Sequence, residues 1–149
     1  SGPSGTCISA EEIDRTIQPG DLKCGGSFMI FNEQRDILEI LKNFTDFFKS
    51  ESCGICTPCR AGNFIIQRKL EKISLNLAYQ KDYDEIREWG EIMRKASRCG
   101  LGKTATNALL QALDKFPDYF SSRLDAEEEG FNKQFDLEKA VQEYEQFKS

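Results

Sequence analysis

Four cysteines constrain this chain more than any other feature of its sequence. Cys53, Cys56 and Cys59 are spaced three residues apart, and Cys99 follows much later in the chain. Three thiols at this spacing can point inward from one tight loop, and a distant fourth thiol can complete the set. The motif therefore predicts a thiolate metal centre, and a fold that returns residue 99 to the loop at residues 53–59.

The three-plus-one spacing is typical of a four-iron cluster, whose cube takes one thiolate at each iron. Structural zinc more commonly takes two cysteine pairs, or two cysteines and two histidines. The sequence contains no histidine, which excludes every histidine-containing zinc site. We predict a [4Fe-4S] cluster on Cys53, Cys56, Cys59 and Cys99, with Phe64 as a candidate shield against water. An all-cysteine zinc site, a disulfide or free thiols are the alternatives.

The cysteine count also bears on the compartment. The chain contains six cysteines, and an even number suits a disulfide framework in short secreted chains with little core. Here 39% of the residues are hydrophobic, and a chain of this size can fold without a metal or disulfide. We therefore expect a reducing, cytoplasmic compartment. Cys7 and Cys24 lie far from the motif and are expected to be small buried apolar side chains.

Charge and composition exclude several classes of function. The net charge is −5, and the acidic surplus falls in residues 118–149. A concentrated basic face, which phosphate binding needs, is missing, so we expect no nucleic-acid partner. The absence of histidine removes Ser-His and Cys-His nucleophile pairs. The longest apolar run, residues 28–31, is too short for a transmembrane segment.

From residue 32 onward, apolar residues recur at helical spacing. The pattern predicts four helices with short connections, and hence a mainly α fold in which residues 32–117 form a four-helix bundle carrying the cluster. The expected helices are one capped by Asn32, one capped by Thr57 with Pro58 at its first position and running towards Leu77, one capped near Asp82 and reaching Ala96, and one that follows Gly102 and is ended by Pro117.

The two ends of the chain differ from this helical part. Residues 1–31 hold glycine-rich turns, a short helical stretch at 10–17 and one predicted strand at 26–31. This is too little for a domain, and the chain starts without methionine, so we interpret residues 1–31 as the end of a domain whose beginning is missing. Residues 118–149 are interpreted as an acidic tail with a terminal helix capped by Asp136.

These motifs resemble the iron-sulfur region of the NADH-oxidising flavoprotein family. That family comprises the NADH-binding subunit of respiratory complex I and its relatives in NAD-reducing hydrogenases and formate dehydrogenases. The resemblance rests on Glu-Ser-Cys-Gly-Ile-Cys-Thr-Pro-Cys-Arg-Ala-Gly at residues 51–62 and on Arg-Cys-Gly-Leu-Gly at residues 98–102. Three further segments, residues 4–9, 26–32 and 135–138, are more similar to the hydrogenase-linked diaphorase branch than to complex I.

The resemblance implies a fold, a function and a set of partners. It implies that residues 1–31 end a β-grasp domain and that the four motif cysteines are the cluster ligands. The implied function is a one-electron relay between a flavin and further iron-sulfur centres in an NAD(H)-linked oxidoreductase. FMN and NAD would bind only on the missing domain or on a partner chain, so this chain is not catalytic alone.

Two hypotheses about function follow from the sequence. In the first, the partners of the chain are a flavin- and NAD-binding domain and other iron-sulfur subunits of a redox complex. In the second, the chain is a zinc-stabilised helical interaction module with no redox role, in which the acidic tail and the terminal helix dock a partner.

Overall fold

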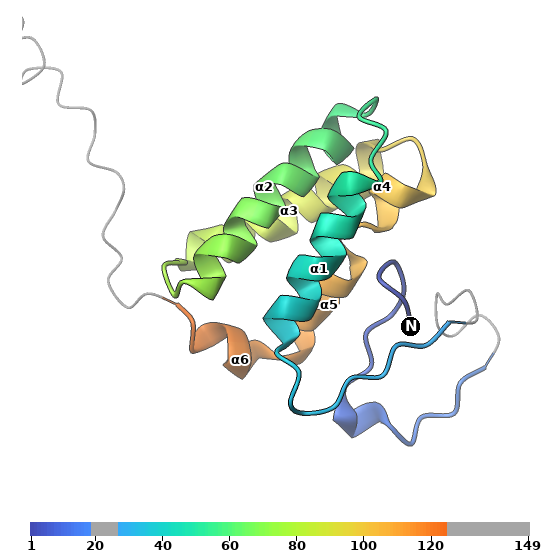
Figure 1. Cartoon of the computed structure of the whole chain (residues 1–149), viewed down its shortest axis with the longest axis vertical. Coiled ribbons are helices and arrows are strands. Elements are labelled where there is room, and N and C mark those ends of the chain that lie inside the picture. Colours follow the sequence, from blue (N-terminus) through green and yellow to red (C-terminus); the bar gives the residue numbers. More distant parts are fainter. Residues whose placement is uncertain (19–26, 125–149) are drawn as a thin grey trace, which may run out of the picture.

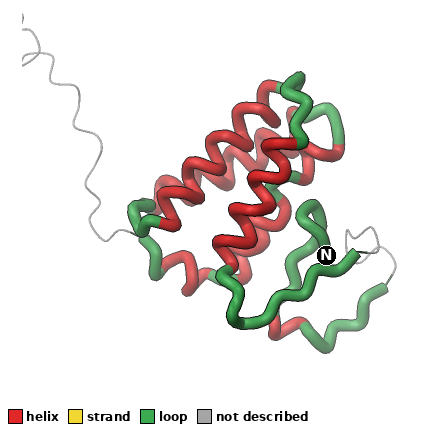
Figure 2. Tube along the Cα trace, viewed as in Figure 1, coloured by secondary structure: helices red, strands yellow, loops and turns green. Residues whose placement is uncertain are grey.

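The computed structural model describes residues 1–18 and 27–124, and this part of the chain is mainly helical (Figure 1, Figure 2). None of its helices is long and apolar enough to cross a bilayer. Its elements are the short 3₁₀ helix η1 (Ala10–Glu12) and the α-helices α1 (Ile37–Ser50), α2 (Thr57–Ser74), α3 (Gln80–Ala96), α4 (Gly100–Thr104), α5 (Asn107–Lys115) and α6 (Pro117–Ser121).

The helices share one apolar core. Helix α2 packs against α1 and α3, and α3 also contacts α4 and α5 (Figure 1). Each long helix places apolar residues three and four positions apart on the face that meets its neighbours. The largest fully buried side chains are Leu38 of α1, Ile66, Leu70 and Ile73 of α2, and Ile86 and Met93 of α3.

The first helix begins later than predicted. Asn32 does not cap it, because the helix starts at Ile37 with Asp36 as its N-cap. The Asp36 carboxylate accepts hydrogen bonds from the N–H groups of Leu38 at 2.7 Å and Glu39 at 3.4 Å. Asparagine and aspartate are equally good caps, so sequence alone does not choose between them.

The caps of the next two helices are each displaced from the predicted residue. The N-cap of α2 is Cys56 and not Thr57, so Pro58 is the second residue of the helix and not the predicted first. Helix α3 starts after Tyr79. Asp82 lies three residues further on, and its carboxylate accepts a hydrogen bond from the Tyr79 N–H at 3.0 Å. Asp82 therefore stabilises the start of the helix from inside its first turn.

The fourth predicted helix is divided in two. Helix α4 begins at Gly100, and α5 follows the buried residue Thr106. The break falls at Ala105 and Thr106, after the glycines of α4. Threonine and glycine favour a helix less than the alanine and leucine of α5 do. Helix α5 ends at Lys115, shortly before Pro117, and Pro117 is itself the first residue of α6. Proline suits the first turn of a helix, where its missing N–H needs no partner.

The described residues before α1 form no regular strand. Residues 27–31 of the predicted strand form none, and within 1–18 and 27–124 the structure has only an isolated bridge between Ala78 and Leu124. A strand needs a neighbouring strand to pair with. The helical stretch predicted at 10–17 shortens to η1. The β-grasp remnant and the four-helix bundle remain predictions, and the terminal helix at Asp136 lies outside the described residues.

The N-terminal segment packs on α5. The Cys7 N–H donates to Gln111 at 2.8 Å, and the Asn107 amide donates to the Ser4 carbonyl at 2.8 Å. The Lys115 ammonium donates to the Cys7 carbonyl at 2.8 Å. Side chains of one helix thus bind the backbone of residues 4–7, although the two segments are far apart in sequence.

Candidate metal centre

The cysteine loop lies between α1 and α2, and local contacts set its shape. Gly54 has a φ of +76°, a left-handed conformation that glycine adopts at little cost. Its N–H donates to the Ser52 hydroxyl at 3.3 Å, and its carbonyl accepts a hydrogen bond from Arg60. These contacts hold the segment with Cys53 and Cys56 against the first turn of α2.

Cys59 is the buried member of the motif. Its side chain lies in the first turn of α2, and the residue is 5% exposed. The Ser52 hydroxyl lies 3.4 Å from its sulfur. The Asn63 amide donates to the Cys59 carbonyl at 2.9 Å and reaches the sulfur at 3.5 Å. Hydrogen bonds of this kind stabilise a thiolate and orient it towards a metal.

Cys99 comes from a part of the sequence far from the other three cysteines, where the chain passes from α3 to α4. It is the N-cap residue of α4. The backbone N–H groups of Gly102 and Leu101, at the start of α4, lower the pKa of the Cys99 thiol below its ordinary value. Because the thiolate is the metal-binding form, this backbone geometry suits a ligand.

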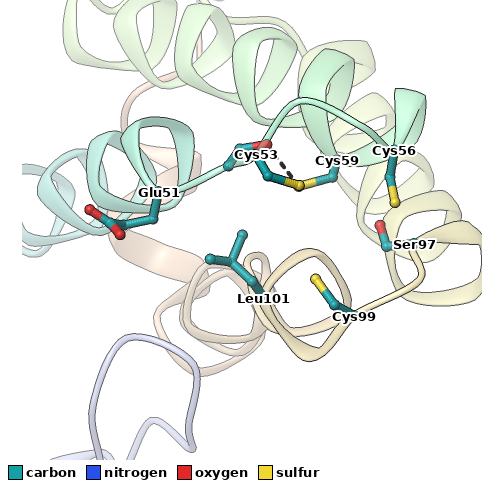
Figure 3. Close-up of a pocket in the computed structure, with 8 residues that line it drawn as sticks. Glu51, Cys53, Cys56, Cys59, Ser97, Cys99 and Leu101 are labelled. Carbon is teal, nitrogen blue, oxygen red and sulfur yellow. Dashed lines mark hydrogen bonds between the residues drawn. The ribbon is translucent and has the colours of Figure 1, made fainter.

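These elements enclose one pocket that holds all four motif cysteines. Its volume is about 150 Å³, and the sulfurs of Cys56, Cys59 and Cys99 face its interior (Figure 3). The fold therefore returns residue 99 to the loop at residues 53–59. The residues that line the pocket are Glu51, Ser52, Cys53, Cys56, Cys59, Ser97, Cys99 and Leu101.

The size of the pocket suits a group of several atoms. A cavity of about 150 Å³ is large enough to admit benzene, and a four-iron, four-sulfide cube is a compact group of eight atoms. Among the described residues, no three Cys, Asp or Glu side chains converge on one point as a single metal ion requires.

Ser97 gives an independent indication that the pocket accommodates an acceptor. The residue is 4% exposed, and its hydroxyl oxygen is buried without a hydrogen-bond partner in the structure. Buried polar groups are almost always paired. A sulfur-rich group bound in the pocket would supply the missing acceptor, so the residues present fit such a group.

The state of the thiols bears on the disulfide alternative. All five cysteines in the described part of the chain are free, with no disulfide between them. Cys7 is half-buried and is therefore more exposed than predicted. Cys24 lies outside the described residues.

Sequence reasoning missed the polar residues around the ligands. Ser52 precedes the first cysteine, and Asn63 lies four residues after Cys59, a helical spacing that could have identified it. Ser97 carries no local signal, because its position depends on how α3 and α4 meet. Phe64, the predicted shield of the cluster, is 48% exposed and does not line the pocket.

Comparison with known protein families shows which family the chain belongs to. Residues 39–123 match the family described as the NADH-ubiquinone oxidoreductase-F iron-sulfur binding region. The chain belongs to this family. The matched region contains all four cysteines of the pocket, and the resemblance found in the sequence motifs is confirmed.

Individual relatives agree with this assignment. The chain is 46% identical over 146 residues to the alpha subunit of the NAD-reducing hydrogenase HoxS of Cupriavidus necator, covering 97% of this chain and 24% of that one. It is 34% identical over 114 residues to an NADH-quinone oxidoreductase subunit of Aquifex aeolicus, covering 75% of this chain and 27% of the relative. The sequence identity is higher to the hydrogenase subunit than to the quinone oxidoreductase subunit. This agrees with the prediction that the chain is more similar to the hydrogenase-linked branch than to complex I.

A solved structure is also similar. The crystal structure of an NAD+-reducing [NiFe]-hydrogenase in the H2-reduced state matches with a TM-score of 0.79 and 33% sequence identity. The match covers 99% of this chain and 26% of the hydrogenase chain. The chain thus spans about a quarter of the length of the relatives it matches.

Proposed function

We propose that this chain is a one-electron relay, in which a [4Fe-4S] cluster on Cys53, Cys56, Cys59 and Cys99 connects a flavin with further iron-sulfur centres. The observation that carries the proposal is the pocket, which gathers four thiols from two distant segments in a member of an iron-sulfur family. Its volume and its unpaired Ser97 hydroxyl support a group larger than one ion.

The chain's own residues position and protect the bound group. The four thiolates would hold it, and when bound it supplies reversible one-electron oxidation and reduction. Ser52 and Asn63 orient the Cys59 sulfur, and the Leu101 side chain gives the pocket an apolar wall. Backbone N–H groups of α4 favour the charged form of Cys99. These features set the burial, charge and hydrogen bonding that tune a cluster's potential.

The wider proposal concerns the complex in which the relay works. The relatives are named as an NAD-reducing hydrogenase subunit and an NADH-quinone oxidoreductase subunit. We place this chain in such an NAD(H)-linked oxidoreductase in the cytoplasm, beside other iron-sulfur subunits. FMN and NAD bind on a domain outside this chain or on a partner chain, so the chain performs no bond chemistry by itself.

A reductive titration tests the relay role. The anaerobically purified chain is titrated with dithionite while its visible and electron paramagnetic resonance spectra are recorded. The proposal expects broad absorption that bleaches reversibly with the uptake of one electron per chain. A Cys7→Ser variant is the control and behaves as wild type. A colourless chain that holds zinc and takes up no electrons would replace the relay with the zinc-stabilised module.

A further inference from the structure

Among the described residues around the pocket, Ser97 has a side-chain oxygen that is buried without a hydrogen-bond partner. The Ser52 hydroxyl and the Asn63 amide both contact Cys59, so each has a partner within the protein. The Ser97 oxygen is buried and has none. Leaving a buried hydroxyl unpaired is unfavourable, so the fold holds this group ready for an acceptor that the protein itself does not supply.

The position of Ser97 identifies where that acceptor lies. Ser97 is the C-cap residue of α3, two residues before Cys99, and it lines the same pocket as the cysteines. In the close-up its side chain lies between those of Cys56 and Cys99 (Figure 3). The atoms that would fill this space are the sulfurs of a bound group and of its ligands. Sulfur accepts hydrogen bonds from hydroxyl groups, and such bonds influence the reduction potential of a cluster.

Gly102 keeps the Ser97 hydroxyl in this place. A Cβ at residue 102 would lie 2.6 Å from the Ser97 oxygen and 2.7 Å from its Cβ. Only glycine leaves this space free, so the first turn of α4 can pack directly on the serine. The serine is thus confined between α4 and the pocket, and its hydroxyl rotates within a small space.

We propose that Ser97 donates a hydrogen bond to a sulfur atom of the cluster or its thiolates, and that it raises the reduction potential of the centre. This inference rests on the proposed function, because it needs a sulfur-rich group in the pocket. The direction follows from charge: reduction adds an electron to the cluster, and a donor to sulfur stabilises the more negative state. Ser97 acts as a positioning residue and does not itself bind iron.

Three substitutions of Ser97 distinguish a hydrogen bond to sulfur from a purely structural role. Ser97→Ala removes the hydroxyl, while Ser97→Thr retains it. Ser97→Val matches the threonine variant in shape without the hydroxyl, so the Thr and Val pair isolates the hydrogen bond. Ser74→Ala is the control, because the Ser74 hydroxyl already donates to the Glu71 carbonyl at 2.7 Å and lies outside the pocket.

The first readout is the reduction potential of the cluster-loaded chain, measured by redox titration with resonance detection. We expect Ser97→Ala and Ser97→Val to shift the potential to more negative values, and Ser97→Thr and Ser74→Ala to stay near wild type. If Ser97→Ala keeps its full iron content and the wild-type potential, the inference is wrong. If the wild-type chain binds no cluster at all, the proposed function itself has failed.

The second readout is the melting temperature with and without metal. With the cluster bound, Ser97→Ala is expected to melt at a lower temperature than wild type, because it has lost a hydrogen bond. Without metal it is expected to melt at the same temperature or higher, since an unpaired buried hydroxyl has been removed. A variant that is equally destabilised in both forms, or that does not fold without metal, would show a structural role and overturn the inference.

Discussion

At the scale of single residues, the four motif cysteines lie in unequal environments. Cys59 is buried and contacts two polar side chains, whereas Cys53 and Cys99 are exposed. A metal group held by these cysteines would therefore lie between the protein interior and its surface. Substitution of an exposed cysteine should therefore affect metal binding far more than the stability of the fold.

Replacing Cys99 tests this separation. Cys99→Ser removes the fourth thiolate, so we expect the iron content of the purified chain to fall severely. The free energy of unfolding of the metal-free chain should change by no more than about 0.5 kcal/mol, because the residue is exposed. Iron analysis and urea unfolding measure the two effects, with Cys7→Ser as the matched control. A Cys99→Ser chain with wild-type iron content would contradict the assignment of this ligand.

Two glycines of α4 offer a test of the space behind the pocket. A Cβ at Gly102 would lie 2.6 Å from the Ser97 oxygen and 3.1 Å from the Cys59 Cβ, while a Cβ at Gly100 meets nothing within 4 Å. Gly102→Ala is expected to destabilise the chain by about 1–3 kcal/mol through overpacking and to lower its iron content. Gly100→Ala should match wild type in both measurements. Equal behaviour of the two variants would show that this contact is unimportant.

At the scale of elements, an ion-pair network joins α2 to the start of α3. Asp82 is buried, and its carboxylate accepts hydrogen bonds from Lys69 at 2.8 Å and Lys72 at 2.7 Å. Burial by itself would raise the pKa of Asp82, but these bonds and one from the Tyr79 N–H lower it to about 2. Lys69 also pairs with Glu85 of α3. The network thus gives the Tyr79 N–H at the start of α3 a hydrogen-bond acceptor, and it holds α2 and α3 together.

The lowered pKa predicts a specific acid sensitivity. Because the folded pKa of Asp82 lies below the ordinary value of about 3.9, its contribution to stability is present above about pH 5 and is lost as the pH falls towards 2. Asp82→Asn should lower the free energy of unfolding of the metal-free chain by about 1–3 kcal/mol at pH 7 and flatten its decline between pH 5 and 2. Asp84→Asn, at an exposed position of α3, is the control. A full acid-dependent decline in the Asp82 variant would refute this explanation.

The elements also show what the sequence could and could not predict. Long helices such as α2 and α3 were predictable because their apolar residues recur at helical spacing. Their starting points were not, since Asn32 and Asp36 are equally good caps and only the fold selects one. The cysteine spacing predicted a common site, and the pocket brings the four thiols together. The Ser97 hydroxyl depends on the meeting of α3 and α4, which no local pattern encodes.

At the scale of the whole molecule, the metal pocket and the apolar core are separate. In the described part of the chain, the apolar core includes Leu70, Ile73 and Ile86 and contains none of the residues that line the pocket. The N-terminal segment is bound on α5 by side chains that also lie outside the pocket. The helices therefore have an apolar core of their own, so a group bound in the pocket would add to their stability without being its source.

Removing the metal tests this independence. The metal-free chain should retain its helical circular dichroism and unfold cooperatively, at a lower temperature than the loaded chain, because a bound group stabilises the folded state. The comparison uses chain from one preparation, with iron removed by a chelator under reducing conditions and then restored. Loss of the helical signal with the iron, as in domains that fold only around a metal, would contradict a separate core.

The most direct test of the central claim is the iron, sulfide and zinc content of the anaerobically purified chain. The same sample gives the visible spectrum. A [4Fe-4S] cluster on the four cysteines predicts about four irons and about four sulfides per chain, with brown colour and no stoichiometric zinc. One zinc per chain, no sulfide and no colour would contradict the cluster and the relay function together.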